Sequence, residues 1–408
     1  MAEVNHKERA HALLSASSAS RWMACTPSAV KEDAYEDQSS EFAKEGELAH
    51  ELAEIKLRSK LNMVLARRST DKETKDRRAK MDEIFASKYY NKEMDEHTTS
   101  YVDYVIAQFL GARRKDPAAV LLIETRLDFS HIVPDGFGTG DALVIGNGSI
   151  EVIDLKYGAG VRVSAYDNKQ MKLYGVGAVS MFDDLYEFDA VALTVFQPRM
   201  DNISTFNTTY EELTRWATDE VAPIAEKAFK GEGELVPGDH CGFCKHKVKC
   251  SALLEEARNL FAAATTNPIP DATDEDLLEV YKRADRISGY LTAVADHILS
   301  EALSGKKWEG FKLVEGRSVR TISDTDKAEE ILKEEGFGVE DIYTMKLKGL
   351  GDLEKLVGKK RFTEVMSPVI SKPAGRPTLA PESDKRPALN LVESAAALFG
   401  AVEGDEEI

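Results

Sequence analysis

The feature that most constrains the fold is an Asn-Gly turn between two apolar segments. Residues 140–146 and 150–155 are rich in aliphatic side chains, and Gly146-Asn147-Gly148 separates them. Asn-Gly pairs favour tight β-hairpin turns, because both central positions of such a turn adopt positive φ. The two segments are therefore predicted to pair as antiparallel strands.

Three charged residues interrupt the apolar pattern of this hairpin. Asp141 stands near the start of the first strand, and Asp154 and Lys156 stand at the end of the second. In a hairpin centred near Asn147, Asp141 and Asp154 lie opposite each other, and Asp154 and Lys156 share a face. Two carboxylates at one level of a sheet predict a site for Mg²⁺ or Mn²⁺, because such cations prefer carboxylate oxygens. The alternative is a structural ion pair between Lys156 and one acid.

The surrounding pattern predicts an α/β protein with a mixed β-sheet flanked by helices. Helices are expected over residues 40–58, 98–112, 165–181 and 211–229, and strands over 119–129, 140–146, 150–155 and 188–196. Strands and helices that alternate in this way pack as layers around one core. We expect this core, residues 1–262, to be followed by a linker over residues 263–273.

The C-terminal third is predicted to be a mainly helical α+β extension. Residues 274–370 contain helical patterns and a short hairpin, with strands over 311–314 and 319–322 that turn at Gly316. Residues 371–408 are rich in proline and end in acidic residues, which indicates a flexible tail. The apolar segment within this tail is either a partner-binding peptide or a frayed end without function.

Charge and hydropathy exclude several classes of protein. The chain has 53 Lys and Arg against 71 Asp and Glu, a formal charge of −18, so DNA binding would require a locally basic groove. No apolar run reaches the roughly 18 residues of a membrane span. The N-terminus has no apolar signal core, so we expect a cytoplasmic protein without a membrane partner.

The four cysteines predict a metal or cluster site. Cys241, Cys244 and Cys250 lie within ten residues, and Cys25 is far upstream. A disulfide framework is rare in cytoplasmic proteins. Four cysteines suit either an iron–sulfur cluster or Zn²⁺. His240 and His246 also permit a local zinc site that would leave Cys25 free.

Other polar residues stand out within apolar elements. His50 lies on the first helix, Glu124 interrupts an apolar strand, and Gln170 and Tyr174 lie four residues apart on one helix face. Taken singly, His50 is more typical of a structural histidine, and Glu124 faces either solvent or the same cation as Asp141.

Taken together, these motifs resemble a known nuclease family over roughly residues 15–255. The order His50, Glu124, Gly-x-Gly-Asp141, Asp154-x-Lys156 and Gln170-x-x-x-Tyr174 resembles the RecB-like branch of the PD-(D/E)xK nucleases. The cysteine pattern is similar to iron–sulfur members of that branch, the AddB-type nuclease domains and the CRISPR-adaptation exonucleases. Residues 14–22, 310–317 and 384–389 also resemble a bacteriophage and prophage family of unknown function.

The resemblance implies a restriction-endonuclease-like core and a metal-dependent DNA exonuclease. His50, Asp141, Asp154 and the Leu155 carbonyl would hold Mg²⁺ or Mn²⁺, with Glu124 as a further ligand or nearby acid. Lys156 would orient water or stabilise charge, and Gln170 and Tyr174 would position DNA or Lys156. A [4Fe–4S] cluster, or alternatively structural Zn²⁺, would join the N-terminal segment to the end of the nuclease domain through Cys25, Cys241, Cys244 and Cys250.

The same resemblance implies partners and a biological setting. The substrate would be linear DNA ends, resected during phage recombination or replication in a bacterial host cell. A single-strand annealing or single-strand-binding protein could bind the tail, and the chain could form a homo-oligomer. A structure-specific endonuclease and a non-catalytic DNA-binding scaffold are the alternatives. Candidate DNA contacts are Arg67, Arg68, Arg113, Arg114, Lys169 and Lys172, although the charged run over residues 66–80 is also typical of a solvated helix face.

Overall fold

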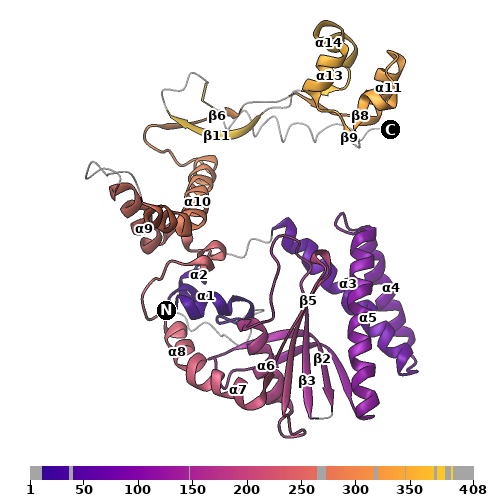
Figure 1. The fold of residues 1–408 in the computed structure, drawn as a ribbon, viewed down its shortest axis with the longest axis vertical. Helices are drawn as coiled ribbons and strands as arrows, with labels where there is room; N and C mark the ends of the chain where they lie inside the picture. Colours follow the sequence, from indigo (N-terminus) through magenta and orange to yellow (C-terminus); the bar gives the residue numbers. More distant parts are fainter. Residues whose placement is uncertain are drawn as a thin grey trace, which may run out of the picture. The chain divides into compact units, whose positions relative to one another are not determined.

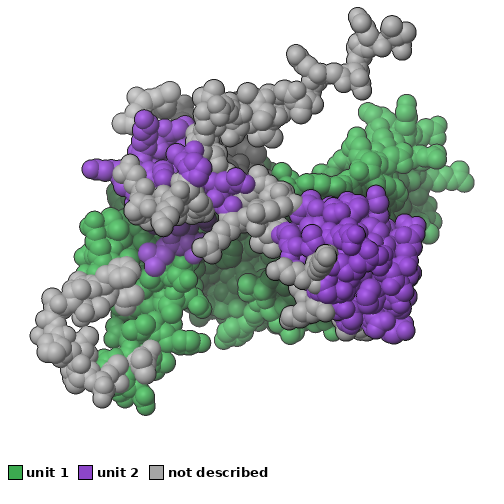
Figure 2. All heavy atoms as spheres, turned by 90° about the horizontal axis from the view of Figure 1, so that it is seen from above, with its two compact units in different colours: residues 1–290 green, residues 291–408 purple. Residues whose placement is uncertain are grey.

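The computed structural model describes residues 12–35, 40–146, 148–263, 273–316, 320–344, 346–371, 375–381 and 387–388. The chain divides into two compact units, Met1–Tyr290 and Leu291–Ile408, which Figure 2 colours separately. In the described part of the chain, no helix combines the length and apolar character that a membrane crossing requires. The division between the two compact units falls within a long helix, and most of the linker expected over residues 263–273 lies outside the described residues.

A five-stranded mixed sheet forms the centre of the first unit (Figure 1). The strands lie side by side in chain order, and β3 and β4 are parallel whereas the other neighbouring pairs are antiparallel. The parallel pair is connected by helix α6, as parallel strands require a crossover. The strands are β1 (Val120–Asp128), β2 (Phe137–Gly146), β3 (Ser149–Leu155), β4 (Ala190–Gln197) and β5 (Asn202–Thr209).

Helices cover both faces of this sheet (Figure 1). On β2, Leu143 and Ile145 face the core formed with α6 (Lys169–Phe182) and its neighbours, whereas Ala142 and Val144 face the core formed with α3 and α5. This alternation follows from the two-residue period of a strand. The other covering helices are α1 (Ala19–Ala24), α2 (Ser28–Glu32), α3 (Glu41–Val64), α5 (Lys92–Lys115), α7 (Tyr210–Trp216) and α8 (Ala222–Lys230).

The three helices nearest the acidic residues begin at capping side chains. The side chains of Ser40, Asn91 and Asn168 accept hydrogen bonds from backbone N–H groups in the first turns of α3, α5 and α6. Such caps satisfy donors that have no partner within the helix. They define where each helix starts relative to the sheet.

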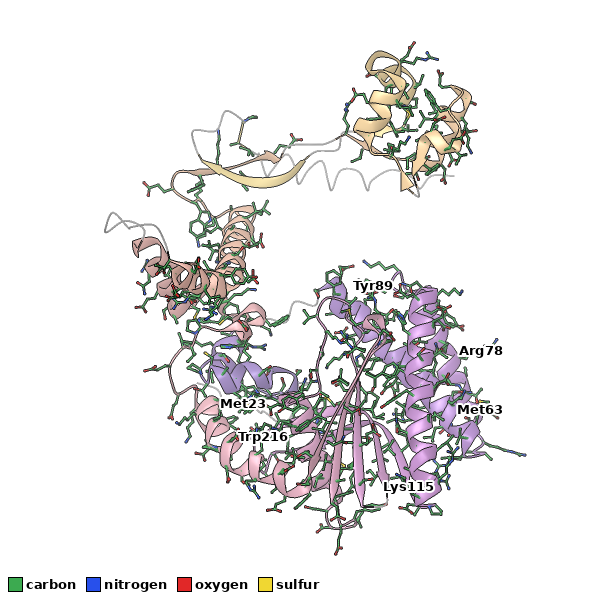
Figure 3. The ribbon with its side chains drawn as sticks, viewed as in Figure 1. Met23, Met63, Arg78, Tyr89, Lys115 and Trp216 are labelled. Atoms are coloured by element: carbon green, nitrogen blue, oxygen red, sulfur yellow. The ribbon has the colours of Figure 1, made fainter. Side chains whose placement is uncertain are left out.

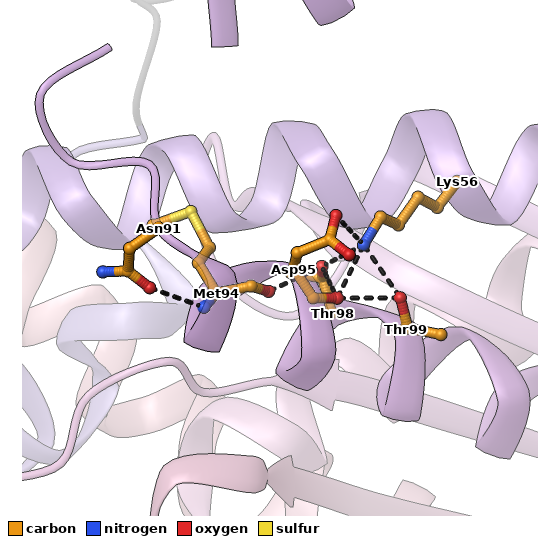
Figure 4. A network of polar contacts seen from close by, with 6 residues as sticks. All are labelled: Lys56, Asn91, Met94, Asp95, Thr98 and Thr99. Atoms are coloured by element: carbon orange, nitrogen blue, oxygen red, sulfur yellow. Dashed lines mark hydrogen bonds and ion pairs between the residues drawn. The ribbon is translucent and has the colours of Figure 1, made fainter. Parts of the chain in front are cut away.

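A polar network joins α3 to the start of α5 (Figure 4). The Lys56 ammonium forms an ion pair with Asp95 at 2.9 Å and donates to the Asp95 carbonyl at 2.7 Å. It also donates to the hydroxyls of Thr98 and Thr99, each at 2.9 Å. Because Lys56 lies on α3 and its partners lie on α5, these contacts join the two helices, and the buried Thr98 hydroxyl also donates to the Met94 carbonyl at 2.8 Å.

The charged run over residues 66–80 contributes to helix α4 (Asp71–Ala86), which packs on α3. Ile84 is its buried residue, and Figure 3 shows Arg78 on its outer side. Most of this helix is exposed to solvent.

Beyond the sheet, α9 (Ser251–Ala263) and α10 (Asp274–Leu303) follow the cysteine segment. The second unit has its own small core, which includes Leu332, Ile342, Leu353 and Phe362. Its helices are α11 (Thr325–Glu334), α12 (Val339–Ile342), α13 (Leu350–Val357) and α14 (Lys359–Met366). Its strands are β6 (Phe311–Gly316), β7 (Thr321–Ile322), β8 (Tyr343–Thr344), β9 (Lys346–Leu347), β10 (Ile370–Ser371) and β11 (Gly375–Pro381).

The mixed sheet with flanking helices confirms the predicted fold class, but the edge strand β5 was not predicted. Its residues alternate between more and less exposed positions and are mostly polar. An edge strand has one solvated side, so it does not need an apolar run. The helix expected over 211–229 also differs, because a π-helical turn at Ala217–Val221 separates α7 from α8.

The predicted hairpin between residues 311–314 and 319–322 is wrong. Strand β6 pairs with β11, and β7 pairs with β10, so each segment has a partner much later in the chain. Long-range pairing of short strands leaves no local turn signal in the sequence. The tail predicted to be flexible from residue 371 includes β11, and its segment over residues 389–408 lies outside the described residues.

Candidate active site

Three acidic residues form a row across neighbouring strands. The pairs Ile123↔Ala142 and Thr125↔Gly140 place Glu124 opposite Asp141. The pair Ala142↔Ile153 likewise places Asp141 opposite Asp154 in the next position of the ladder. The row therefore follows from strand register, and its second half is the arrangement that the hairpin turn predicted.

Asp141 is the centre of this row. One of its carboxylate oxygens lies 3.4 Å from His50 Nδ1, and the other accepts a 2.6 Å hydrogen bond from the Leu155 backbone N–H. Burial disfavours the ionised carboxyl, but His50 and the backbone N–H outweigh it and lower the pKa of Asp141. Burial disfavours the protonated form of His50, but the charge and hydrogen bond of the adjacent Asp141 outweigh burial and raise the pKa of His50 to about 9. The two side chains therefore stabilise each other as an ion pair.

Glu124 adopts an unusual backbone conformation for a strand residue. Its φ is 49°, in the left-handed region that non-glycine residues rarely occupy. Burial and the nearby charge of Asp141 raise its pKa to about 7. Ligand atoms of His50, Glu124 and Asp141 all lie within 4.8 Å of one another. A strained residue at the meeting point of two acids and a histidine is typical of a functional site.

Asp154 and Lys156 form the other half of the site. Lys156 Nζ lies 2.9 Å from Asp154, whose side chain is 5% exposed. Burial raises the pKa of Asp154, and Lys156 opposes this effect. Burial would lower the pKa of Lys156, but the carboxylate of Asp154 outweighs it and raises the lysine pKa. The structural ion pair considered for this lysine is thus present, and it lies within the row of acids.

Helix α6 extends this pair into a chain of hydrogen bonds. Lys156 donates to Gln170 Oε1 at 3.1 Å, and Gln170 Nε2 donates to the Tyr174 hydroxyl at 3.1 Å. Burial raises the pKa of Tyr174, so this hydroxyl stays protonated. The structure therefore brings His50, Glu124, Asp141, Asp154, Leu155, Lys156, Gln170 and Tyr174 together around one row of carboxylates.

Of the basic residues considered as DNA contacts, the four arginines lie away from this row, whereas the two lysines lie on α6 beside Gln170. Arg113 and Arg114 lie at the end of α5 near the β2–β3 turn, where Figure 3 shows Lys115. Val120 on β1 is also near this turn, and the strand from Val120 to Glu124 spans about 13 Å, which separates the turn from the row of acids. Arg67 and Arg68 follow the end of α3, about 20 Å along that helix from His50. Lys169 and Lys172 lie on the same turn of α6 as Gln170. Lys172 forms an ion pair with Asp167 at 2.6 Å.

The cysteine segments meet although they are far apart in the sequence. Cys25 follows α1, and Cys241, Cys244 and Cys250 belong to a segment of short 3₁₀ turns. The Lys245 backbone N–H donates to Glu32 at 2.8 Å, and the Tyr35 hydroxyl lies 3.1 Å from His246 Nδ1, 211 residues away. Cys25, Cys241 and Cys250 are buried, and all four thiols are free of disulfides.

Burial shifts the pKa values of two thiols and two imidazoles of this region towards their neutral forms. Burial raises the pKa of Cys244 to about 12, and burial together with Cys250 and Cys25 raises that of Cys241. Burial lowers the pKa of His240 and of His246. His240 Nε2 lies 2.9 Å from the Val236 carbonyl, so each imidazole already has one nitrogen engaged.

Two residues near the acids were not singled out from the sequence. Glu54 lies four residues after His50 on α3, and Tyr101 lies on α5; both line the pocket that contains His50, Glu124 and Asp141. The spacing between His50 and Glu54 is a signal that could have identified Glu54. Tyr101 falls within the apolar stripe of its helix, so its pattern indicates only a core position.

The fold and the site define an α/β protein whose mixed sheet carries a partly buried row of carboxylates beside a lysine. Residues 11–387 match the family described as "Protein of unknown function (DUF2800)", and the chain belongs to that family. A solved structure titled "Crystal structure of SSO0001" is 17% identical, with matches over 40% of this chain and 79% of that chain and a TM-score of 0.21.

Proposed function

We propose that this protein is a metal-dependent DNA nuclease that acts as an exonuclease on linear ends. The observation that carries the proposal is the row Glu124–Asp141–Asp154 with Lys156 paired to its last member. The proposal also draws on the resemblance of these motifs to RecB-like nucleases.

The side chains present suit a hard divalent cation. The donors close to one another are one imidazole and two carboxylates, and no thiol is among them. Such a set is typical of Mg²⁺ or Mn²⁺ sites. His50, Asp141, Asp154 and the Leu155 carbonyl would hold the cation, with Glu124 beside them. When bound, the cation would neutralise charge on the phosphodiester and make water more acidic.

Lys156 would orient the attacking water or stabilise charge on the phosphate. Its ammonium is held by Asp154 on one side and by Gln170 on the other. Tyr174 fixes the Gln170 amide in turn, so the direction of the lysine is set before substrate binds. Preorganised charge of this kind is a large contribution to catalysis.

His50 would lose its proton to become a ligand. Its imidazole is protonated in the ion pair with Asp141, because its pKa is about 9. The negative charge of Asp141 stabilises the proton on His50. A cation bound at Asp141 would neutralise that charge and so favour loss of the proton. Cation binding should therefore release protons.

The path of DNA must be local, since the whole chain is acidic. Among the candidate contacts, Lys169 lies in the first turn of α6 beside Gln170, and we propose it as the nearest phosphate contact. Arg67, Arg68, Arg113 and Arg114 would contact only DNA that extends over the far end of the sheet.

The cysteines would hold a [4Fe–4S] cluster, with structural Zn²⁺ as the alternative. The approach of Cys25 to the segment that contains Cys241, Cys244 and Cys250 favours a site that uses all four thiols. The cluster would join the N-terminal segment to the end of the nuclease domain, and it would take no part in hydrolysis.

The setting of the reaction is part of the same proposal. The enzyme would resect linear DNA during phage recombination or replication in the cytoplasm of a bacterial host. Its tail could bind a single-strand annealing or single-strand-binding protein, and the chain could form a homo-oligomer. The partner-binding segment of the tail lies outside the described residues.

The test uses protein purified without oxygen and four DNA substrates, linear and covalently closed, single- and double-stranded. With Mn²⁺ or Mg²⁺, we expect loss of end-labelled linear DNA, intact closed circles, and no cleavage after EDTA. Cleavage of closed circles would replace the exonuclease with an endonuclease. DNA binding without cleavage, with a full cysteine site, would indicate a non-catalytic scaffold and overturn the proposal.

A further inference from the structure

The segment between β3 and α6 connects two groups that meet in the site. This crossover segment, residues 156–168, begins with Lys156 and ends at the cap of α6, two residues before Gln170. The 3.1 Å hydrogen bond from Lys156 to Gln170 therefore joins the start of the segment to the helix that follows it. The segment, which the structure describes throughout, contains no helical or strand residue, and most of its residues are exposed. Its course must therefore be fixed by contacts with other elements.

The side chain of Gln197 holds the first half of the crossover segment. Gln197 is the last residue of β4, and its exposed fraction is 1%. Its amide nitrogen donates to the Gly158 carbonyl at 2.7 Å and to the Val161 carbonyl at 2.8 Å. Its amide oxygen accepts from the Val163 N–H at 3.0 Å. One buried side chain thus satisfies backbone groups that have no partner in a helix or strand.

Asn202, at the start of β5, completes this network. Its amide nitrogen donates to the Val163 carbonyl at 2.8 Å and to the Gln197 amide oxygen at 3.2 Å. Its amide oxygen accepts from Arg162 Nε at 3.0 Å. Each of the two amide nitrogens therefore has an acceptor for both of its N–H groups. A buried network that is satisfied in this way rigidifies the elements that it joins.

The same end of β4 also holds the backbone of Lys156. The Lys156 N–H donates to the Phe196 carbonyl at 2.9 Å, and Phe196 directly precedes Gln197. Farther along the segment, the Ala165 N–H donates to the Ser204 hydroxyl at 2.9 Å. The strands β4 and β5 carry no member of the acidic row, yet they hold the segment that leads from the lysine to α6.

We propose that Gln197 is a positioning residue that acts through the crossover segment to keep Lys156 in contact with Gln170. Without the Gln197 amide, the carbonyls of Gly158 and Val161 would lose their partner, and the segment would have to move to bring them into contact with water. Such a movement begins two residues after Lys156, so it would loosen the lysine. The role of this contact in catalysis rests on the proposed function, but the effect of Gln197 on Lys156 does not.

Two substitutions on β4 separate this role from general stability. Gln197→Met keeps the length of the side chain, adds no charge and removes the three hydrogen bonds to the backbone of the segment. Thr194→Val is the matched control, because Thr194 is fully buried and its hydroxyl donates to Glu151 at 2.8 Å, away from the segment. Each change removes a buried polar group from the same strand, but only the first reaches the crossover segment.

The first measurement is the rate at which acetic anhydride modifies Lys156 in the full-length protein, without metal or DNA, followed by mass spectrometry. Lys60 on α3 is the internal reference, because its side chain is exposed. We expect Gln197→Met to raise the rate at Lys156 about fivefold relative to Lys60, the effect of one weakened hydrogen bond. Thr194→Val should change this rate less than about twofold, and thermal unfolding should show that both variants are folded.

The second measurement is DNA cleavage together with Mn²⁺ affinity by calorimetry. We expect Gln197→Met to lower kcat about tenfold and to leave KM and Mn²⁺ affinity within about twofold of wild type. The side chains proposed to hold the cation lie on α3, β2 and β3, where strand register and helix packing position them. A general loss of structure would instead weaken Mn²⁺ binding and lower kcat together, and an unchanged kcat would contradict the role in catalysis.

An equal rate of Lys156 modification in Gln197→Met and the wild type would overturn the proposal, as would an equal rise in Thr194→Val. If the wild type does not cleave DNA, the proposed function fails, but the modification rates still decide whether Gln197 positions the lysine. If Gln197→Met does not fold, Asn202→Ser provides the same test, because it removes the donor to the Val163 carbonyl. Faster modification of Lys156 in that variant would support the proposal, and an unchanged rate would contradict it.

Discussion

The acidic row and the cysteine region are built in opposite ways. Glu124, Asp141 and Asp154 lie on three adjacent strands, where ladder hydrogen bonds fix their register. The cysteines lie beside short 3₁₀ turns and at the end of a short helix. Their two segments are joined by single contacts across the chain, such as Tyr35 to His246.

This difference indicates which region is organised before its metal binds. Strand register positions the three acids before any metal binds, and it places them close together and includes a Glu124 with a strained backbone. The cysteine segments have little regular structure to hold them together. A metal or cluster is therefore expected to add activity at the first site and stability at the second.

The largest effect on stability is expected from the cysteines. Cys25→Ser should remove the visible absorbance of an iron–sulfur cluster and lower Tm by about 10 °C or more, because closing a loop of this length stabilises a fold by up to about 5 kcal/mol. Cys241→Ser should have the same effect. Metal analysis, absorbance and thermal unfolding of the anaerobic protein measure these changes.

The zinc alternative makes a different prediction for the same variants. If Zn²⁺ is held by Cys241, Cys244, Cys250 and a histidine, Cys25→Ser should keep its metal, whereas His240→Gln or His246→Gln should lose it. A colourless wild type with one zinc per chain would contradict the cluster.

The acidic row should make the metal-free protein less stable as pH rises. His50 has a pKa of about 9 in the fold against 6.5 as its ordinary value, so its stabilising effect is complete below pH 6.5 and is lost by about pH 9. The Glu124 pKa rises from 4.5 to about 7, which adds a loss of stability between those pH values. Urea unfolding should therefore show declining stability from about pH 5 to 9.

Two variants separate these contributions. Glu124→Gln should flatten the decline below pH 7, and His50→Gln should flatten it above pH 7. Mn²⁺ affinity should change in the opposite direction and rise with pH, since the cation displaces protons from both groups. A wild type whose stability rises over this range relative to both variants would contradict the assigned protonation states.

The smallest effect is expected from the polar network that joins α3 to α5. Lys56→Met should lower the free energy of unfolding by about 1–3 kcal/mol, because it leaves a buried Thr98 hydroxyl and the Asp95 carboxylate with one partner fewer. Lys60→Met is the control. Lys60 lies on the same helix and its ion pair with Asp103, at 3.4 Å, is exposed. Equal destabilisation by both changes would show that the network has no special role.

Local patterns in the sequence were sufficient for the acidic hairpin. The Asn-Gly turn fixes which residues of β2 and β3 stand opposite each other, so the meeting of Asp141 and Asp154 follows from counting. The helix spacing of Gln170 and Tyr174 likewise predicted neighbours that now form a hydrogen bond. Each of these inferences depends on a single element or turn.

Features that depend on packing between distant elements could not be predicted in this way. In the sequence, Tyr101 looks like one more core residue of α5, and only the placement of that helix over β2 makes Tyr101 a lining residue of the pocket. The partners of β6 and β7 lie in later segments without a turn signal. The polar edge strand β5 was missed because it has no apolar run to detect.

The most direct test of the central claim is the rate of linear DNA cleavage by Asp154→Asn against Glu151→Gln. Both changes convert a carboxylate on β3 to an amide, but Glu151 bonds with Thr194 at 2.8 Å, outside the site. We predict that Asp154→Asn loses about 10³-fold or more in rate, equivalent to about 4 kcal/mol, while Glu151→Gln stays within about threefold of wild type. An Asp154→Asn protein that cleaves DNA as fast as Glu151→Gln would show that the acidic row is not an active site.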